Sequence, residues 1–366
     1  NKNHIKLMIQ PLFPNIKIEK VRLNSKSTFN LNLNKRYKIE KFKIFSDINL
    51  DELIVTNHLE FKRFFPKIKK KISFLKNKIS IDYSNENLKI NGKGKIFLQN
   101  NLDNINYLIQ KENKKYKFKT TLEIQKNPFE IKLLDYEKDN KKKLLLNIEG
   151  YIKENNKTLF DLISIEESKN KFEIRKLLFN EKFQIIDFEK AKIFYLDKKN
   201  NQNELNILKG KKDFLLSGKS FNADKIISNL IKNDVDEKKF INKDFNLKVK
   251  IDKLFLNQDY SLKNFEGGLS FKNQKIINGN LVGFFSNNQK LKFTVKTNND
   301  EKITTLFLDR AKPIVSRYSF IKGFDEGVLD FYSSKKNKIS NSTLKIYDFK
   351  LKELPALTKL LTLASL

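Results

Sequence analysis

The chain offers few residues for acid–base catalysis or metal binding. Its 366 residues include only two histidines, His4 and His58, and no cysteine. Neither histidine has a second histidine or a carboxylate at the spacing that a metal site or a proton relay uses. The absence of cysteine excludes disulfides, thiolate metal sites and cysteine nucleophiles. We therefore expect both histidines to be structural or solvated.

Neighbouring carboxylates occur at Asp51-Glu52 and at Glu166-Glu167. Adjacent residues of a strand point to opposite faces, so neither pair can act together on one reacting bond. The sequence also contains no GxSxG elbow, no phosphate-cradling glycine loop and no HExxH helix. We expect these carboxylates to form a solvated surface, and we expect a protein that is not an enzyme and uses no cofactor or metal.

Lysine dominates the charge of the chain. Lys and Arg together number 74 and Asp and Glu number 43, which gives a formal net charge of +31. Such a charge is typical of partners of nucleic acids or anionic membranes. The abundance of Lys, Asn and Ile is also what an AT-rich genome imposes on solvent-facing positions. The basic clusters at 67–71 and 141–143 lack arginine forks and aromatic stacking platforms, so we expect no nucleic acid.

Single apolar residues alternate with Lys or Asn along much of the chain. The clearest examples are Phe29–Leu33, Tyr116–Thr120, Phe245–Ile251 and Leu291–Val295. This period of two predicts strands with one apolar and one wet face. Polar clusters such as Asn91–Gly94 and Asn278–Asn280 predict turns between successive antiparallel strands. We therefore expect a mainly β fold.

Helical spacing is rare and occurs in Leu59–Leu75, in Asn222–Lys232 and from Leu354 to the end. In the second stretch apolar residues share one face after Asn222, a residue type that caps helices well. A charged break follows at 233–239. We therefore predict a β-rich segment over residues 1–232 that ends in this helix, and a C-terminal β region over 233–366 with a terminal leucine-rich helix.

No run of apolar residues reaches the roughly 18 to 20 that a membrane-spanning helix needs. The N-terminal residues Asn-Lys-Asn-His also lack the apolar core of a signal peptide. The chain does not start with Met and stops in an apolar run. We expect it to be an internal piece of a longer protein, with any anchoring segment outside it.

A series of short sequence motifs follows in a fixed order from Phe245 onward. They are Phe245–Leu254, Leu262–Leu269, Leu308–Val315, Phe320–Leu329 and Leu344–Leu351, the last joined to the proline-led, leucine-rich segment Leu354–Ser365. This order resembles the C-terminal region of the AsmA-like, YhdP-type proteins of Gram-negative envelopes. The motif positions that carry the resemblance include Asp309, Gly323, Gly327, Asp348, Pro355, Leu360 and Leu361. The heavy load of Lys and Asn departs from the family pattern.

The resemblance implies a long, twisted antiparallel sheet curled into an elongated groove, with a few short helices. It also implies a periplasmic protein that is anchored to the inner membrane and carries phospholipid between the inner and outer membranes. Phospholipid acyl chains and the two membranes would then be its partners. The alternatives are a structural or outer-membrane-assembly envelope factor that conducts no lipid, and a basic nucleic-acid-binding protein.

The apolar sides of the clearest strands would line such a groove. Each buried CH₂ group of an acyl chain contributes about 0.8 kcal/mol, so binding needs no specific polar contact. The candidate lining residues are Phe118, Leu122, Phe245, Leu247, Val249, Ile251, Leu291, Phe293 and Val295. The same residues fit an ordinary closed core equally well, because alternation identifies the apolar side of a strand but not what covers it.

Overall fold

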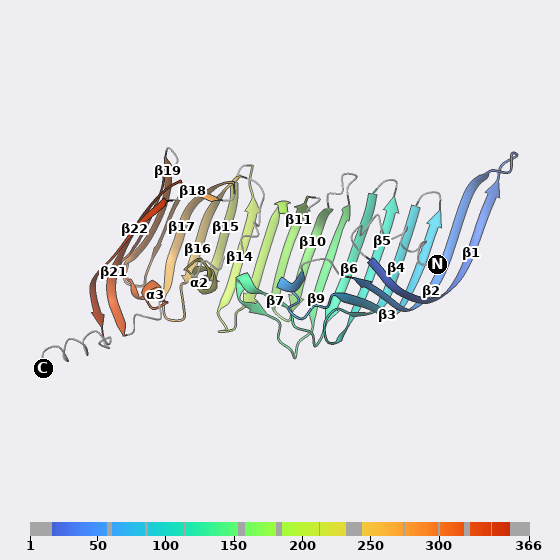
Figure 1. The fold of residues 1–366 in the computed structure, drawn as a ribbon, viewed down its shortest axis with the longest axis horizontal. Coiled ribbons are helices and arrows are strands. Elements are labelled where there is room, and N and C mark those ends of the chain that lie inside the picture. The colour runs from blue at the N-terminus through green and yellow to red at the C-terminus, as the bar shows by residue number, and fades with distance from the viewer. Residues whose placement is uncertain are drawn as a thin grey trace. The chain divides into compact units, whose positions relative to one another are not determined.

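The computed structural model is mainly β: 74% of the residues that it describes lie in strands, and the same residues include two short α-helices (Figure 1). The described residues are 17–56, 61–84, 87–112, 115–152, 158–180, 185–211, 213–231, 244–273, 275–298, 301–317, 323–337 and 339–351. The chain divides into two compact units, Asn1–Lys199 and Asn200–Leu366. His4 and His58 lie outside the described residues.

The first unit is an antiparallel meander, in which neighbouring strands of the sheet follow one another along the chain. Its strands are β1 (Lys17–Leu33), β2 (Ile39–Thr56), β3 (Lys71–Ser84), β4 (Asn87–Phe97), β5 (Leu102–Glu112), β6 (Lys115–Ile124), β9 (Leu144–Ile152), β10 (Thr158–Glu167), β11 (Asn170–Phe179) and β13 (Lys190–Leu196). The short β12 (Ile185–Asp187) pairs with β11. A separate small hairpin, β7 (Glu130–Ile131) and β8 (Tyr136–Glu137), lies in the connection from β6 to β9.

Two connections of the first unit close one end of its apolar face. The connection from β2 to β3 contributes Phe65, and the connection from β6 to β9 contributes Phe129 and Tyr136, to a buried cluster with side chains of the sheet. The two connections are also joined to each other, because the amide of Glu130 donates to the carbonyl of Phe64 at 3.1 Å. This end of the first sheet is therefore an ordinary sealed core.

The second unit has strands β14 (Gln202–Lys209), β15 (Asp213–Asn222), β16 (Phe245–Phe255), β17 (Ser261–Lys272), β18 (Lys275–Phe284), β19 (Lys290–Asn298), β20 (Glu301–Leu308), β21 (Phe324–Lys336) and β22 (Ile339–Leu351). Its helices are α2 (Asp224–Ile231) and α3 (Lys312–Val315). Each strand pairs with its neighbour in sequence. The predicted strands Phe245–Ile251 and Leu291–Val295 are confirmed as β16 and β19.

The pairs of this second sheet are antiparallel as expected, except that β15 and β16 are parallel. Parallel neighbours need a long crossover connection. Here the connection contains α2, the helix predicted at Asn222–Lys232. The predicted domain boundary after residue 232 falls within this crossover, between two strands that are hydrogen-bonded neighbours.

The prediction of a helix at Leu59–Leu75 was wrong for residues 61–75, the part of this segment that the structure describes. The structure has a short 3₁₀ turn at Phe61–Arg63 and enters β3 at Lys71. Ile72 and Phe74 alternate with polar neighbours, and Lys71 pairs with Thr56 of β2. Pairing with β2 therefore overrides the local helical spacing. The leucine-rich helix predicted from Leu354 lies outside the described residues.

The turns predicted at Asn91–Gly94 and Asn278–Asn280 were also wrong, because both clusters lie inside strands. At Gly92 the ring of Tyr107 crosses the strand so closely that a Cβ atom would lie 2.2 Å from a ring carbon. Burial of the ring also raises the pKa of Tyr107 to about 12. The absence of a side chain at Gly92 therefore leaves room for the ring of Tyr107 on the neighbouring strand.

Candidate functional site: the apolar faces of the two sheets

In the second unit the strand register aligns one row of apolar side chains across the whole sheet. Residues that face each other in a ladder point to the same side, so a chain of paired residues marks one face. The row, here called the apolar row, is Ile207, Leu216, Val249, Gly267, Leu281, Phe293, Leu306, Phe331 and Leu344. The side of the sheet that carries this row is called its apolar face.

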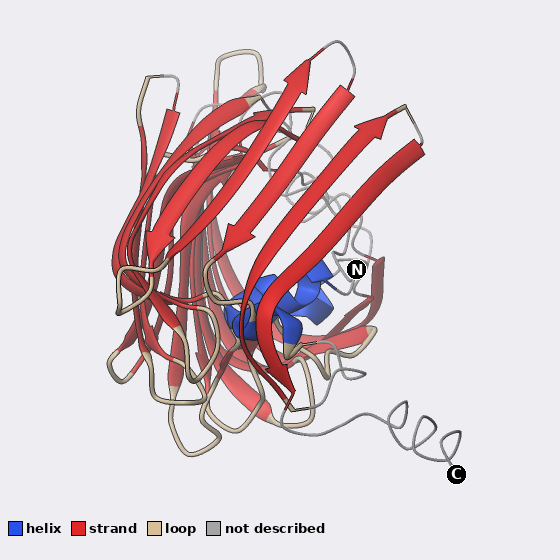
Figure 2. Cartoon of the chain, turned by 90° about the vertical axis from the view of Figure 1, so that its left-hand side faces the viewer, coloured by secondary structure: helices blue, strands red, loops and turns tan. Residues whose placement is uncertain are grey.

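The apolar face of the second unit is sealed at one end and less covered in the middle. Leu308 and Leu329 lie on the same face, two residues beyond the paired Leu306 and Phe331 in the direction of α3, and they are 0% and 1% exposed. Phe293 and Leu306 of the apolar row are only half-buried, and Leu344 on β22 is 53% exposed. Figure 2 shows the strands of this unit bending around the side on which its helices lie. The helices therefore cover one end of a curved face.

The structure brings the seven predicted residues of the second unit onto this one face. Val249, Ile251, Leu291 and Val295 are buried, and Phe245, Leu247 and Phe293 are half-buried. The pairing of Val249 with Gly267, then Leu281, then Phe293 shows that β16 and β19 present the same side.

The two predicted residues of the first unit, Phe118 and Leu122, share the apolar face of its sheet but differ in burial. Leu122 belongs to the sealed core and is 7% exposed. Phe118 is half-buried, and its ring packs edge-on against Phe160 with centroids 5.7 Å apart. Phe160 in turn contacts Phe179 at 5.4 Å. The closed-core interpretation thus holds for Leu122, while Phe118 belongs to a partly open aromatic row.

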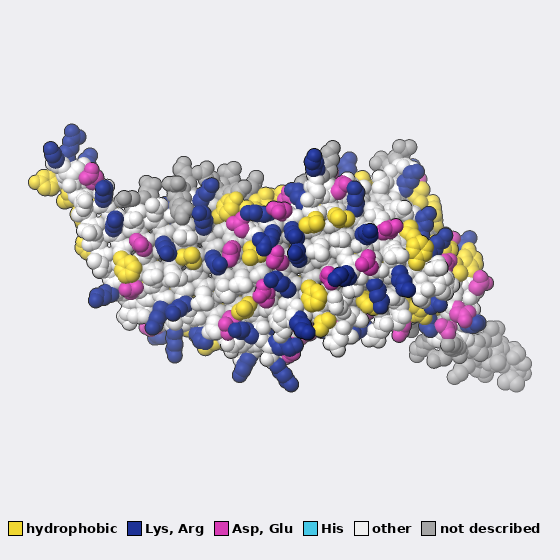
Figure 3. All heavy atoms as spheres, turned by 180° about the vertical axis from the view of Figure 1, so that it is seen from behind, with side chains coloured by type: hydrophobic (Ala, Val, Ile, Leu, Met, Phe, Trp, Pro, Cys, Tyr) yellow, Lys and Arg dark blue, Asp and Glu magenta, His cyan; other side chains and the backbone are white. Residues whose placement is uncertain are grey.

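The opposite faces of the sheets are polar and carry both signs of charge. Figure 3 shows Lys and Arg side chains interspersed with Asp and Glu over the face that it views. The two basic clusters of the sequence contribute to ion pairs there. Lys71 lies 2.6 Å from Glu19, and Lys143 lies 3.6 Å from Glu123. Lys71 and Lys143 are therefore each paired with a carboxylate.

Glu167 departs from the expectation of a solvated carboxylate, because it is 2% exposed. Its two oxygens accept hydrogen bonds from the Tyr136 hydroxyl at 2.9 Å, the Asp139 amide at 2.7 Å and the Asn170 side chain at 2.9 Å. Burial and the nearby Glu167 charge raise the pKa of Tyr136. The neighbouring Glu166 faces away and pairs with Lys171 at 3.0 Å. Glu167 therefore anchors the connection between β6 and β9 and has no free oxygen for acid–base work.

A second buried carboxylate, Asp103, stabilises the same connection. Its oxygens accept from the Asn127 side chain at 2.6 Å and from the Gln125 amide at 3.2 Å. Burial raises the pKa of Asp103, and burial lowers the pKa of nearby Lys138. The Lys138 ammonium donates to the carbonyls of Gln125 and Asp139. These contacts are structural, because they fix one loop to the end of a sheet.

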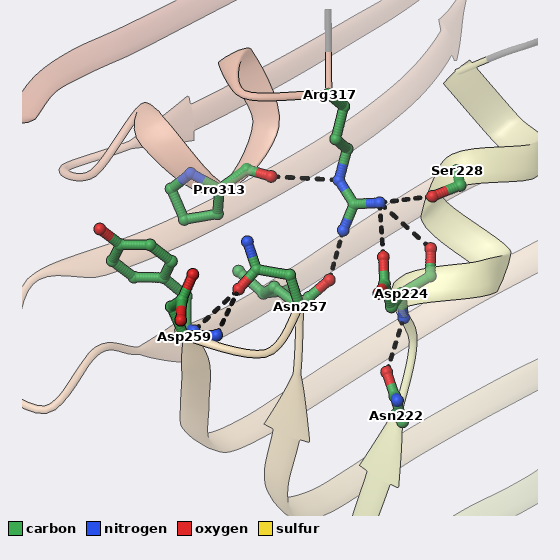
Figure 4. A network of polar contacts seen from close by, with 9 residues as sticks. Asn222, Asp224, Ser228, Asn257, Asp259, Pro313 and Arg317 are labelled. Atoms are coloured by element: carbon green, nitrogen blue, oxygen red, sulfur yellow. Dashed lines mark hydrogen bonds and ion pairs between the residues drawn. The ribbon is translucent and has the colours of Figure 1, made fainter. Parts of the chain in front are cut away.

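The helices of the second unit are joined by Arg317 (Figure 4). Its guanidinium donates to the carbonyl of Pro313 at 3.1 Å, to Oδ1 of Asp224 at 2.8 Å and to Oγ of Ser228 at 2.5 Å. It also donates to the carbonyl of Leu256 at the end of β16. One side chain therefore holds both helices against the end of the apolar face.

The motif positions that suggested a family have local structural roles where the structure describes them. An oxygen of Asp309 accepts from the amide of Lys290 at 2.7 Å. Gly323, Gly327 and Asp348 have positive φ angles of 65°, 81° and 51°. Pro355, Leu360 and Leu361 lie outside the described residues.

The described part of the chain contains no group of three His, Asp or Glu side chains that could hold a metal ion. In the same residues no helix has the length and apolar character to cross a membrane. No family model, curated protein or solved structure matches this chain. Its function must therefore be inferred from the geometry of the apolar faces.

Proposed function

We propose that this chain is a groove-forming, periplasmic segment of an AsmA-like envelope protein that binds or conducts phospholipid between the inner and outer membranes. Its anchor to the inner membrane would lie in a segment outside this chain. The observation that carries the proposal is the apolar row of the second unit. It crosses every strand of that sheet, and its middle residues stay half-buried.

The dimensions of the apolar row suit an acyl chain that lies across the strands. Neighbouring strands are about 4.8 Å apart. An acyl chain that fills one leaflet of a hydrocarbon core about 30 Å thick is roughly 15 Å long, so it would cross three or four strands. Such a chain would cover Leu281, Phe293 and Leu306 on β18, β19 and β20. Covering these apolar surfaces supplies the binding free energy without specific polar contacts.

The side chains of adjacent strand residues point to opposite faces of the sheet, and the experiment that tests this proposal compares two such residues. A photo-reactive phenylalanine analogue is placed at Phe293 on the apolar face, or at Lys292, which is exposed on the other face. The full chain is expressed in a bacterial periplasm, irradiated and analysed by mass spectrometry. We expect phospholipid adducts at position 293, with at least tenfold fewer at position 292.

Equal labelling at the two positions, or no lipid at either, would overturn the proposal. A chain without bound lipid that instead binds oligonucleotides with a steep salt dependence would support a nucleic-acid-binding protein. A chain that binds neither ligand would support a structural or outer-membrane-assembly factor.

A further inference from the structure

Lysines face each other across strands at one edge of the second unit. The edge is the one where the hairpins β17–β18 and β19–β20 turn. Lys272 pairs directly with Lys275, and Lys302 pairs directly with Lys335. Like charges at directly opposed positions of a sheet destabilise it. We call Lys272, Lys275, Lys302 and Lys335 the lysine edge.

The other edge of the same sheet carries two ion pairs. Arg317 pairs with Asp224 at 2.8 Å, and Lys312 pairs with Asp325 at 2.7 Å. The helices α2 and α3 lie at that edge and seal it (Figure 1). Directly opposed lysines also occur near that edge, where Lys253 pairs with Lys263, but both of these side chains are exposed. The lysine edge differs in the position and burial of one of its members, Lys302.

Lys302 stands on the apolar face. Thr304 pairs with Val295, which lies on that face, and Lys302 precedes Thr304 by two residues on the same strand. The Lys302 side chain is half-buried, and among the described residues no carboxylate forms an ion pair with it. The neighbouring carboxylate, Glu301, accepts instead from the hydroxyl of Ser334. Burial, followed by repulsion from Lys335 and Lys275, lowers the pKa of Lys302.

Aromatic side chains occupy the same end of the apolar face. The rings of Phe245 and Phe271 stack with centroids 4.5 Å apart, and Phe214 packs edge-on against Phe245 at 5.6 Å. Phe271 pairs with Ile276, so Lys272 and Lys275, which form the next pair toward the turn, point to the opposite face.

Below Lys302 and Lys335 on the same face lie the hydroxyl-bearing pair Thr304 and Ser333, and then the apolar pair Leu306 and Phe331. A ligand at this edge would therefore meet ammonium groups at the rim, then hydroxyl groups, then apolar surface.

We propose that Lys302 and Lys335 form a phosphate subsite for the headgroup of a phospholipid whose acyl chains lie on the apolar face. The inference rests on the proposed function. A phosphate group supplies several acceptor oxygens and a negative charge, which would offset the repulsion between the two lysines. Free phosphate has the same chemistry at the lysines but offers nothing to the apolar row.

The test measures the binding of three probes to the full chain. They are short-chain phosphatidylglycerol, diacylglycerol with the same tails and no phosphate, and inorganic phosphate. The test variant is Lys302→Gln with Lys335→Gln. The control variant, Lys250→Gln with Lys292→Gln, removes the same charge from exposed positions on the opposite face.

We expect the test variant to bind phosphatidylglycerol at least tenfold more weakly and diacylglycerol with unchanged affinity, and the control variant to match the wild type. Unchanged binding of phosphatidylglycerol by the test variant, or an equal loss in the control variant, would overturn the subsite and leave the proposed function standing. Binding of inorganic phosphate alone, lost in the test variant, would support an anion site at these lysines and would overturn the lipid function.

Discussion

Nη1 of Arg317 lies 2.8 Å from Oδ1 of Asp224, so the chain just after α3 is tied to the first residue of α2 (Figure 4). The Arg317 side chain is only 11% exposed, and the Asp224 side chain is 28% exposed. Because the same guanidinium also donates to the end of β16, it fixes the position of both helices on the sheet. The sealed end of the apolar face therefore depends on one charged side chain.

Replacing Arg317 with Ala is expected to loosen α2. The substitution removes a charge-assisted hydrogen bond to Asp224 and leaves a largely covered carbonyl of Leu256 without its donor, at a cost of about 2 kcal/mol. Hydrogen exchange of the amides in Asp224–Ile231 should then accelerate about 30-fold, which is the same free energy expressed as a rate. As a control, Lys350→Ala breaks an exposed ion pair with Glu326 and should change exchange little. Equal effects of the two substitutions would contradict this role of Arg317.

Gly267, the one glycine of the apolar row, should not tolerate a side chain. Its φ angle is +146°, and a Cβ atom there would lie 1.9 Å from the carbonyl oxygen of Asn280. Gly267→Ala should therefore lower the free energy of unfolding by about 3 kcal/mol, measured by urea denaturation. The adjacent Gly268 is the control, because the nearest atom to its Cβ would be at an ordinary 3.8 Å. If Gly268→Ala destabilises the chain as much as Gly267→Ala, the explanation fails.

Lipid loading should distinguish two adjacent residues of β18. Leu281 lies in the apolar row, and Val282 pairs with Lys292 on the other face. Both side chains are half-buried, so substitution with Lys perturbs folding to a similar degree at either position. We expect Leu281→Lys to reduce copurified phospholipid at least tenfold and Val282→Lys to leave it close to the wild-type amount. Equal lipid content in the two variants, measured by mass spectrometry, would remove the apolar row as the binding surface.

Local sequence pattern predicted the strands well where Lys separates single apolar residues. The segment Phe245–Ile251 is the start of β16, and Asn222–Lys232 contains α2. The pattern failed where the conformation of a residue is determined by a contact with a residue distant in sequence. Gly92 looks like a turn residue until Tyr107 of the next strand is placed across it, and the parallel pairing of β15 with β16 depends on a crossover.

The candidate site was predictable in part for the same reason. Alternation identified Val249 and Phe293 as apolar positions, but only the register of the intervening strands shows that they share a row. Lys302 and Lys335 are 33 positions apart in a chain full of lysine. No sequence signal distinguishes them from other lysines, because their significance comes from their direct pairing and from the partial burial of Lys302.

The buried carboxylate of Asp103 should give a pH dependence opposite in sign to that of the exposed ion pairs. Its pKa is raised in the folded chain, so the folded state holds this proton more tightly than the unfolded state does. In the range between the ordinary carboxyl pKa of about 3.9 and the raised value, stability attributable to Asp103 falls as pH rises. Exposed carboxylates such as Glu19, whose pKa is lowered by Lys71, lose stabilisation as pH falls. The whole-chain profile therefore mixes the two contributions.

Asp103→Asn isolates the contribution of this carboxylate, because Asn does not titrate but keeps an oxygen to accept from the Gln125 amide or the Asn127 side chain. We expect the free energy of unfolding of the wild type, minus that of Asp103→Asn, to decrease as pH rises through this range and to be flat above it. Urea denaturation at a series of pH values measures the difference. Asp139→Asn provides the opposite sign, since hydrogen bonds to Asp139 from the amide of Lys141 and from Lys142 lower its pKa. A difference for Asp103 that increases with pH would show that its hydrogen bonds outweigh its burial.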